Sequence, residues 1–119
     1  VSATDSLQQA VLATGFAYQR ATTHTNNLAE FERVVLRVRG MRRMGSAALD
    51  LGYVAAGRLD GYWEYHLNPW DTAAGVLLVE EAGGVVRQLD GTPWTLDAPS
   101  ILATNPALRP VLHATLIDD

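Results

Sequence analysis

Two carboxylates in this sequence lie where local patterns favour a chemical role. Asp71 follows Asn68-Pro69, which is typical of a helix start because asparagine caps helices and proline suits the first helical position. Glu64 belongs to the aromatic segment 62–67, whose composition favours a strand. Carboxylates bind hard cations such as Mg²⁺ and accept hydrogen bonds from hydroxyl groups. Asp71 is therefore a candidate metal ligand, and Glu64 is a candidate acceptor for substrate hydroxyl groups.

Both carboxylates also have a structural explanation. In the first turn of a helix, Asp71 complements the helix dipole and can accept a hydrogen bond from the N–H of Asn68. A glutamate on an aromatic strand usually marks the solvent-facing side, which explains Glu64 without a ligand. Trp70, beside Asp71, is interpreted as a core residue rather than as a platform for substrate. Local pattern leaves the structural and the chemical explanations open.

The segment 45–48 reads Gly-Ser-Ala-Ala and is a further candidate binding element. Ser46 is placed to cap the helix that follows. The small side chains of Gly45 and Ala47 would let a polar ligand approach the exposed backbone groups at the start of that helix. A helix start without any ligand accounts for the same residues.

Composition narrows the classes of function. The chain has 119 residues, 48% hydrophobic and 18% charged, as expected for one globular domain. Its formal net charge of -4 argues against a basic surface that binds nucleic acid. Cysteine is absent, which removes thiolate nucleophiles and sulfur-bound metals, and His24, His66 and His113 show no metal-ligand spacing. No apolar run approaches the roughly 20 residues that span a bilayer, so we expect a soluble cytoplasmic protein without a membrane partner.

The order of the apolar patterns predicts a single layered α/β domain over residues 1–119. Strands are expected at 11–14, 41–44, 62–67, 85–89 and 100–104. Helices are expected to start at the caps Asn27, Ser46, Asn68 and Asn105, and the first three are expected to end at Gly40, Gly57 and Gly83. Alternation along 62–67 puts Tyr62, Glu64 and His66 on a polar face and Trp63, Tyr65 and Leu67 on the other.

Three details of the helices follow from the same patterns. Glu30 lies three residues after Asn27, a spacing typical of a capping box. Residues 47–56 are small or apolar almost all round apart from Asp50, which predicts a largely buried helix. Pro110 lies beyond the first turn of the last helix, so we expect that helix to start late or to kink.

A longer motif overlaps the third expected helix. The run Pro-Trp-Asp-Thr-Ala-Ala-Gly at 69–75 continues to Val-Glu-Glu-Ala-Gly-Gly at 79–84, and it resembles the C-terminal signature of the inositol monophosphatase family. Arg-Met-Gly-Ser-Ala-Ala at 43–48 and Tyr-Trp-Glu at 62–64 resemble further segments of that family. The resemblance covers nearly the whole chain. It implies an α/β layered sandwich, the C-terminal half of the inositol monophosphatase and fructose bisphosphatase-like fold.

The resemblance also implies an activity. The family hydrolyses phosphate monoesters of polyols or sugars with Mg²⁺ and a metal-activated water. By this resemblance Asp71 binds the metal, together with two aspartates of an earlier motif, and lines the substrate pocket. Glu64 accepts hydrogen bonds from the polyol, and the backbone around Gly45, Ser46 and Ala47 contacts the same substrate. Members are commonly homodimers, so we expect a homo-oligomer that binds a small phosphate monoester.

Two motifs of the family have no match in this chain. They are the Glu-Glu metal pair and the Asp-Pro-(apolar)-Asp-Gly-Thr segment of its N-terminal half. The sequence therefore predicts the C-terminal half of a longer phosphatase, which supplies one metal ligand and is inactive by itself. One carboxylate holds Mg²⁺ weakly, because the ion sheds its water reluctantly. The alternative is a non-catalytic interaction or regulatory domain derived from the same fold.

Overall fold

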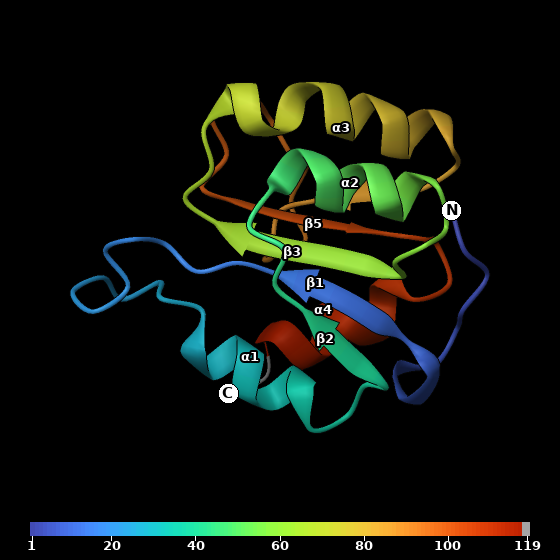
Figure 1. Cartoon of the computed structure of the whole chain (residues 1–119), viewed down its shortest axis with the longest axis horizontal. Coiled ribbons are helices and arrows are strands. Elements are labelled where there is room, and N and C mark those ends of the chain that lie inside the picture. Colours follow the sequence, from blue (N-terminus) through green and yellow to red (C-terminus); the bar gives the residue numbers. More distant parts are fainter. Residues whose placement is uncertain (118–119) are drawn as a thin grey trace.

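The structure is a computed structural model that describes residues 1–117, and it contains a mixed five-stranded sheet with helices on both faces (Figure 1). The strands are β1 (Val11–Thr14), β2 (Gly40–Arg42), β3 (Gly61–Tyr65), β4 (Val85–Arg87) and β5 (Ser100–Thr104). The helices are α1 (Leu28–Val35), α2 (Ala47–Ala55), α3 (Pro69–Glu81) and α4 (Arg109–Ile117). Within residues 1–117, no helix has both the length and the apolar character needed to cross a membrane.

The strand order is β2-β1-β3-β5-β4. β1 pairs in parallel with both β2 and β3, so the carboxyl ends of these three strands lie at one edge of the sheet. β5 runs antiparallel to β3 and β4. β2 and β4 are shorter than the sequence predicts, and each lies at the side of the sheet with a neighbour on one side only. Ligands of α/β sheets bind outside the carboxyl ends of parallel strands, which directs attention to the ends of β1, β2 and β3.

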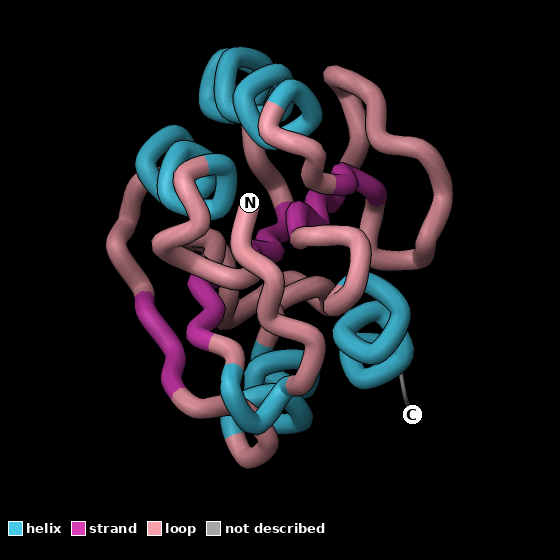
Figure 2. The backbone as a smooth tube through the Cα atoms, turned by 90° about the vertical axis from the view of Figure 1, so that its right-hand side faces the viewer, coloured by secondary structure: helices cyan, strands magenta, loops and turns pink. Residues whose placement is uncertain are grey.

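Two helical layers enclose the sheet. α2 and α3 lie on one face, and α1 and α4 lie on the other (Figure 1, Figure 2). Each layer has its own core: Leu51, Val54 and Val76 pack on the α2 and α3 side, and Val34 and Leu112 on the other. The predicted layered α/β fold is therefore confirmed.

The prediction of a polar face on β3 is wrong. Tyr62 and Trp63 point to opposite faces of the sheet, yet both are 0% exposed because helices cover both faces. Glu64 is half-buried rather than solvent-facing. The strand ends at Tyr65, earlier than expected, and His66 follows in the left-handed region with φ 63°.

The expected capping box at the start of α1 does not form. Asn27 is itself left-handed with φ 68°, and its side chain makes no cap hydrogen bond. Its amide turns inward instead and binds Thr14 and Trp63. α1 also ends at Val35, whereas Gly40, the expected helix end, begins β2. Buried donors and acceptors around Asn27 therefore outweigh its local capping tendency.

α2 is buried on one side only, which corrects the prediction of a largely buried helix. Leu51 is fully buried, whereas Leu49 is 54% exposed. Asp50, the polar exception in the sequence pattern, is 1% exposed and so lies inside. The helix does begin as expected, because Oγ of Ser46 accepts a hydrogen bond from the N–H of Leu49 at 3.3 Å.

The starts of the last two helices agree with the sequence, but the position of Trp70 does not. α3 begins after Asn68, and the Asp71 carboxylate accepts a hydrogen bond from the Asn68 N–H at 3.2 Å. α4 starts only at Arg109, so the late start expected from Pro110 is confirmed. Trp70 is 79% exposed, because the first turn of α3 lies at the rim of a pocket. Its interpretation as a core residue is wrong.

Candidate functional site

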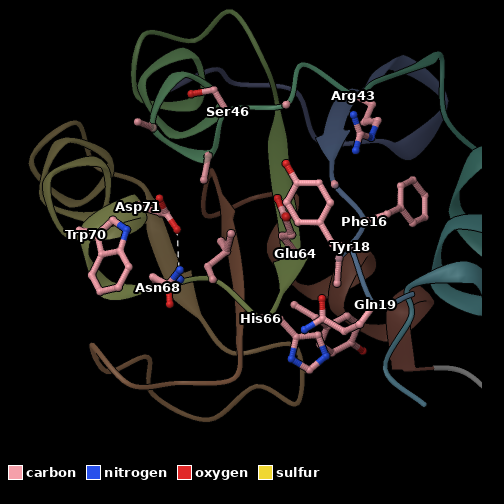
Figure 3. Close-up of a pocket in the computed structure, with 17 residues that line it drawn as sticks. Phe16, Tyr18, Gln19, Arg43, Ser46, Glu64, His66, Asn68, Trp70 and Asp71 are labelled. Atoms are coloured by element: carbon pink, nitrogen blue, oxygen red, sulfur yellow. Dashed lines mark hydrogen bonds between the residues drawn. The ribbon is translucent and has the colours of Figure 1, made fainter. Parts of the chain in front are cut away.

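A pocket of about 420 Å³ opens at the carboxyl ends of β1, β2 and β3 (Figure 3). It is lined by residues 15–19, 43, 45–48, 64–68, 70 and 71. They come from the loop after β1, the loop after β2, the start of α2, the end of β3 and the start of α3. The parallel pairing of three strands therefore brings segments that are distant in sequence into one cavity.

All the residues that the sequence singled out for ligand binding line this pocket, namely Gly45, Ser46, Ala47, Glu64 and Asp71. In the close-up, Glu64 lies between Asp71 and Trp70 on one side and Arg43 and Tyr18 on the other (Figure 3). Two carboxylates, one guanidinium and exposed aromatic rings thus surround the same space.

Two helix starts also meet at this pocket. The first N–H groups of a helix lack partners within the helix and carry partial positive charge, so anions bind there. The pocket lining includes both cap residues, Ser46 of α2 and Asn68 of α3. The hydrogen bond from Asn68 to Asp71 shows that the structural explanation of Asp71 holds, and the same residue still lines the pocket. The arrangement suits a ligand with a phosphate group.

The carboxyl group of Glu64 is held from two sides. The hydroxyl of Tyr62 donates a hydrogen bond to Oε1. The backbone of Gly15 lies so close that a Cβ there would be 2.5 Å from Oε1 and 2.7 Å from Oε2. Burial raises the pKa of Glu64, the Tyr62 hydrogen bond and the charge of Arg43 lower it, and the charge of Asp71 raises it. Glu64 is therefore a constrained carboxyl group at the pocket wall.

Asp50 is a second buried carboxyl group near Glu64. Its Oδ1 has no hydrogen-bond partner within residues 1–117. Burial, reinforced by the charge of Glu64, raises the pKa of Asp50 to about 6. Burial and then the charge of Glu64 also raise the pKa of Tyr62. The Tyr62 phenol thus keeps its proton and acts as a donor.

Sequence reasoning missed several residues of the site. Gly15 directly follows the strand expected at 11–14 and was not singled out, although a glycine at that point is also a signal for close packing. Tyr62 was placed on the same face as Glu64, and this two-residue spacing was the available sign of their contact. Phe16 and Tyr18 carried no local signal, because they lie on a loop whose position depends on the sheet.

Residues 1–117, which the structure describes, do not by themselves provide a complete metal site. Within residues 1–117, no three or more histidine, aspartate and glutamate side chains are grouped so as to hold a metal ion. Asp71 offers one carboxylate at the pocket wall, whereas Mg²⁺ requires near-octahedral oxygen coordination. The residues present fit a contribution to a metal site rather than a whole one.

The fold and the pocket define a protein of the layered α/β class with a cavity at the carboxyl ends of its parallel strands. Residues 1–119 match the model of the inositol monophosphatase family. The inositol-1-monophosphatase of a Synechocystis species is 51% identical over 116 residues, which cover 98% of this chain and 40% of that relative. The chain therefore belongs to the inositol monophosphatase family, as its motifs predicted.

Two further proteins are similar over almost the whole chain. The solved inositol monophosphatase of Anabaena has a TM-score of 0.95 and 50% identity, and the match covers 98% of this chain and 48% of that one. The Nus factor SuhB of Pseudomonas aeruginosa is 43% identical over 118 residues, which cover 98% of this chain and 44% of that relative. This chain spans less than half the length of these relatives.

Proposed function

We propose that this chain is part of a Mg²⁺-dependent phosphomonoesterase of the inositol monophosphatase type, which hydrolyses a polyol or sugar phosphate. The observation that carries the proposal is the single pocket that collects Glu64, Asp71 and the segment 45–47. Family membership and relatives named inositol-1-monophosphatase support the phosphatase class. The chain corresponds to the C-terminal half of such an enzyme, and by itself it is inactive.

Each residue has one role in this proposal. The backbone around Gly45, Ser46 and Ala47 contacts the substrate at the start of α2, where a phosphate is favoured. Glu64 accepts a hydrogen bond from a polyol hydroxyl, and Asp71 holds the metal at the pocket wall. Bound Mg²⁺ would neutralise phosphoryl charge and lower the pKa of its water, with its other ligands supplied from outside this chain.

The proposal includes a cytoplasmic homo-oligomer. Leu49, Leu77 and Leu78 on α2 and α3 are 54%, 60% and 54% exposed, and apolar side chains gathered on two adjacent helices support an association surface. The net charge of -4 supports a small phosphate monoester rather than nucleic acid as the ligand.

The test is an assay of the full-length protein that carries this chain. Inositol phosphates, fructose bisphosphate, histidinol phosphate and sulfated nucleotides would be offered with and without Mg²⁺. We expect Mg²⁺-dependent phosphate release from at least one of them, and weaker activity in the Asp71→Asn and Glu64→Gln variants. No Mg²⁺-dependent release from any of these compounds would overturn the proposal.

A non-catalytic interaction domain is the second candidate. A relative named as a Nus factor favours it. The two candidate functions predict different coding sequences upstream of Val1. An upstream Glu-Glu and Asp-Pro-(apolar)-Asp-Gly-Thr segment would support the enzyme, and a natural start near Val1 would support the interaction domain.

A further inference from the structure

Tyr62 lies behind the pocket wall rather than in it. It precedes Glu64 by two residues on β3, so both side chains lie on the same face of the sheet. Tyr62 is 0% exposed and its hydroxyl donates a hydrogen bond to Oε1 of Glu64. Buried hydroxyl groups need a partner, and Glu64 supplies it here. Tyr62 does not itself line the pocket, so its hydroxyl reaches a ligand only through Glu64.

Gly15 forms the second restraint on the Glu64 carboxyl group. Its backbone is held in place, because Nδ2 of Asn27 donates to the Gly15 carbonyl at 2.9 Å and to Oγ1 of Thr14 at 2.8 Å. The carboxyl group therefore packs against a fixed wall and is fastened by a hydrogen bond at Oε1. Ordering a free glutamate side chain costs conformational entropy, and this cost is met before any ligand arrives.

The two restraints leave one oxygen for a ligand. Oε1 accepts the Tyr62 hydroxyl, and among the hydrogen bonds of residues 1–117 none reaches Oε2. The donor is a neutral phenol, so the negative charge of the carboxylate is not cancelled and its remaining oxygen is a strong acceptor. Such an oxygen attracts a hydroxyl group and repels a carbonyl or phosphate oxygen at the same place.

We propose that Tyr62 is a positioning residue for substrate recognition, which with Gly15 fixes the Glu64 carboxylate so that Oε2 meets one hydroxyl group of the substrate. This inference rests on the proposed function, because it takes Glu64 as the acceptor of a polyol hydroxyl. It adds Tyr62, which does not line the pocket, as a residue that affects which substrate the pocket accepts.

The first test measures the Tyr62–Glu64 contact without any activity. Carboxyl ¹³C NMR of the 119-residue chain would give the pKa of Glu64 in the parent chain, in Tyr62→Phe and in the control Tyr53→Phe, which removes a hydroxyl from α2 away from the pocket. Because the Tyr62 hydrogen bond lowers the pKa of Glu64, we expect Tyr62→Phe to raise it and Tyr53→Phe to leave it unchanged. An unchanged pKa of Glu64 in folded Tyr62→Phe would overturn the inference.

A measurement on the unsubstituted chain covers the case in which Tyr62→Phe does not fold. A buried, hydrogen-bonded hydroxyl proton exchanges slowly with water, so we expect a resolved Tyr62 hydroxyl signal with a nuclear Overhauser effect to Glu64. The signal should be lost in Glu64→Ala, which removes the acceptor at a half-buried position. A Tyr62 hydroxyl that exchanges rapidly in the parent chain would contradict the proposed restraint.

The second test uses the full-length protein with inositol 1-phosphate as the probe. Tyr62→Phe removes one hydrogen bond that orients the Glu64 carboxylate. We therefore expect KM to rise about tenfold with little change in kcat. In Glu64→Ala, which removes the acceptor of the Tyr62 hydroxyl, the added Tyr62→Phe change should have no further effect on KM. Equal, additive effects on KM in both backgrounds would overturn the role of Tyr62. If Glu64→Gln leaves KM unchanged while the NMR contact persists, the proposed role of Glu64 fails instead.

Discussion

The indole N–H of Trp63 donates a hydrogen bond to Oδ1 of Asn27 over 2.6 Å, and both residues are buried. The amide nitrogen of Asn27 donates to Thr14 and to the carbonyl of Gly15. Oγ1 of Thr14 in turn donates to the carbonyl of Trp63 at 2.7 Å. Through its oxygen and its nitrogen, the Asn27 side chain therefore ties the loop between β1 and α1, residues 15–27, to β1 and β3.

The first prediction concerns this amide. Asn27→Ala leaves the buried Trp63 N–H and the Gly15 carbonyl without their partner, so the free energy of unfolding should fall by about 3 kcal/mol. Urea denaturation measures the change. The matched control is Asn26→Ala, whose oxygen accepts one exposed hydrogen bond from Leu28, and it should cost no more than about 1 kcal/mol. Equal losses in the two variants would contradict the role given to Asn27.

The second prediction separates the two explanations of Asp71. Asp71→Asn keeps the size of the side chain and an oxygen that can accept from Asn68, so stability should change by about 1 kcal/mol or less. In the full-length protein, loss of a metal carboxylate should strongly reduce turnover and raise the Mg²⁺ concentration required. Near-normal activity in a folded Asp71→Asn protein would show that the role of Asp71 is purely structural.

The third prediction is a pH dependence of stability caused by Asp50. Its pKa is raised from 3.8 to about 6 in the folded chain, so the folded state holds this proton more tightly than the unfolded state. Stability from this group is therefore highest below pH 3.8 and falls as the pH rises through about 6. Above that range the penalty is about 3 kcal/mol, and Asp50→Asn should remove it.

Denaturation of both chains at pH 5 and pH 8 would check this prediction. Asp50→Asn should be more stable than the parent at pH 8, and the difference should shrink at pH 5. A gain in stability of the same size at both pH values would show that titration of Asp50 is not its cause.

The fourth prediction uses the contact between Gly15 and Glu64. A Cβ at position 15 would overlap the Glu64 carboxyl group, whose end can move, so Gly15→Ala should displace Glu64 rather than unfold the chain. We expect a change in stability below about 1 kcal/mol and roughly tenfold weaker substrate binding in the full-length protein. Gly52→Ala is the control, because nothing lies within 4 Å of its added Cβ; in a helix it should add about 0.5 to 1 kcal/mol of stability and leave binding unchanged. Equally weak binding in Gly52→Ala would contradict the role given to the Gly15–Glu64 contact.

The fifth prediction is that the 119-residue chain self-associates and has no measurable phosphatase activity with excess Mg²⁺. Leu77 and Leu78 on α3 and Leu49 on α2 expose apolar side chains, and the proposal assigns this surface to association between copies of the chain. Sedimentation velocity would measure the association, and replacing Leu77 and Leu78 with glutamine should reduce it. A stable monomer of the parent chain, or activity that Asp71→Asn abolishes in the short chain, would contradict the prediction.

Much of the fold and site was predictable because it depends on local chemistry. The Ser46 hydroxyl accepts from the Leu49 N–H and the Asp71 carboxylate accepts from the Asn68 N–H, so the starts of α2 and α3 agree with the sequence. Pro110 cannot donate a backbone hydrogen bond, so α4 begins late. The segments at 62–64 and 69–84 identified the family, and their carboxylates Glu64 and Asp71 line one pocket.

The sequence by itself determined which segments form strands and helices, and which residue types are available at the carboxyl ends of the strands. The tertiary structure decided the burial of Tyr62, the inward turn of Asn27, the exposure of Trp70 and the contact of Glu64 with Gly15. These features depend on groups that are distant in the chain and meet only when β1 and β3 pair and helices cover both faces. A local sequence pattern carries no information about a partner that is distant in the chain. A buried donor that needs an acceptor therefore outweighs the local conformational preference.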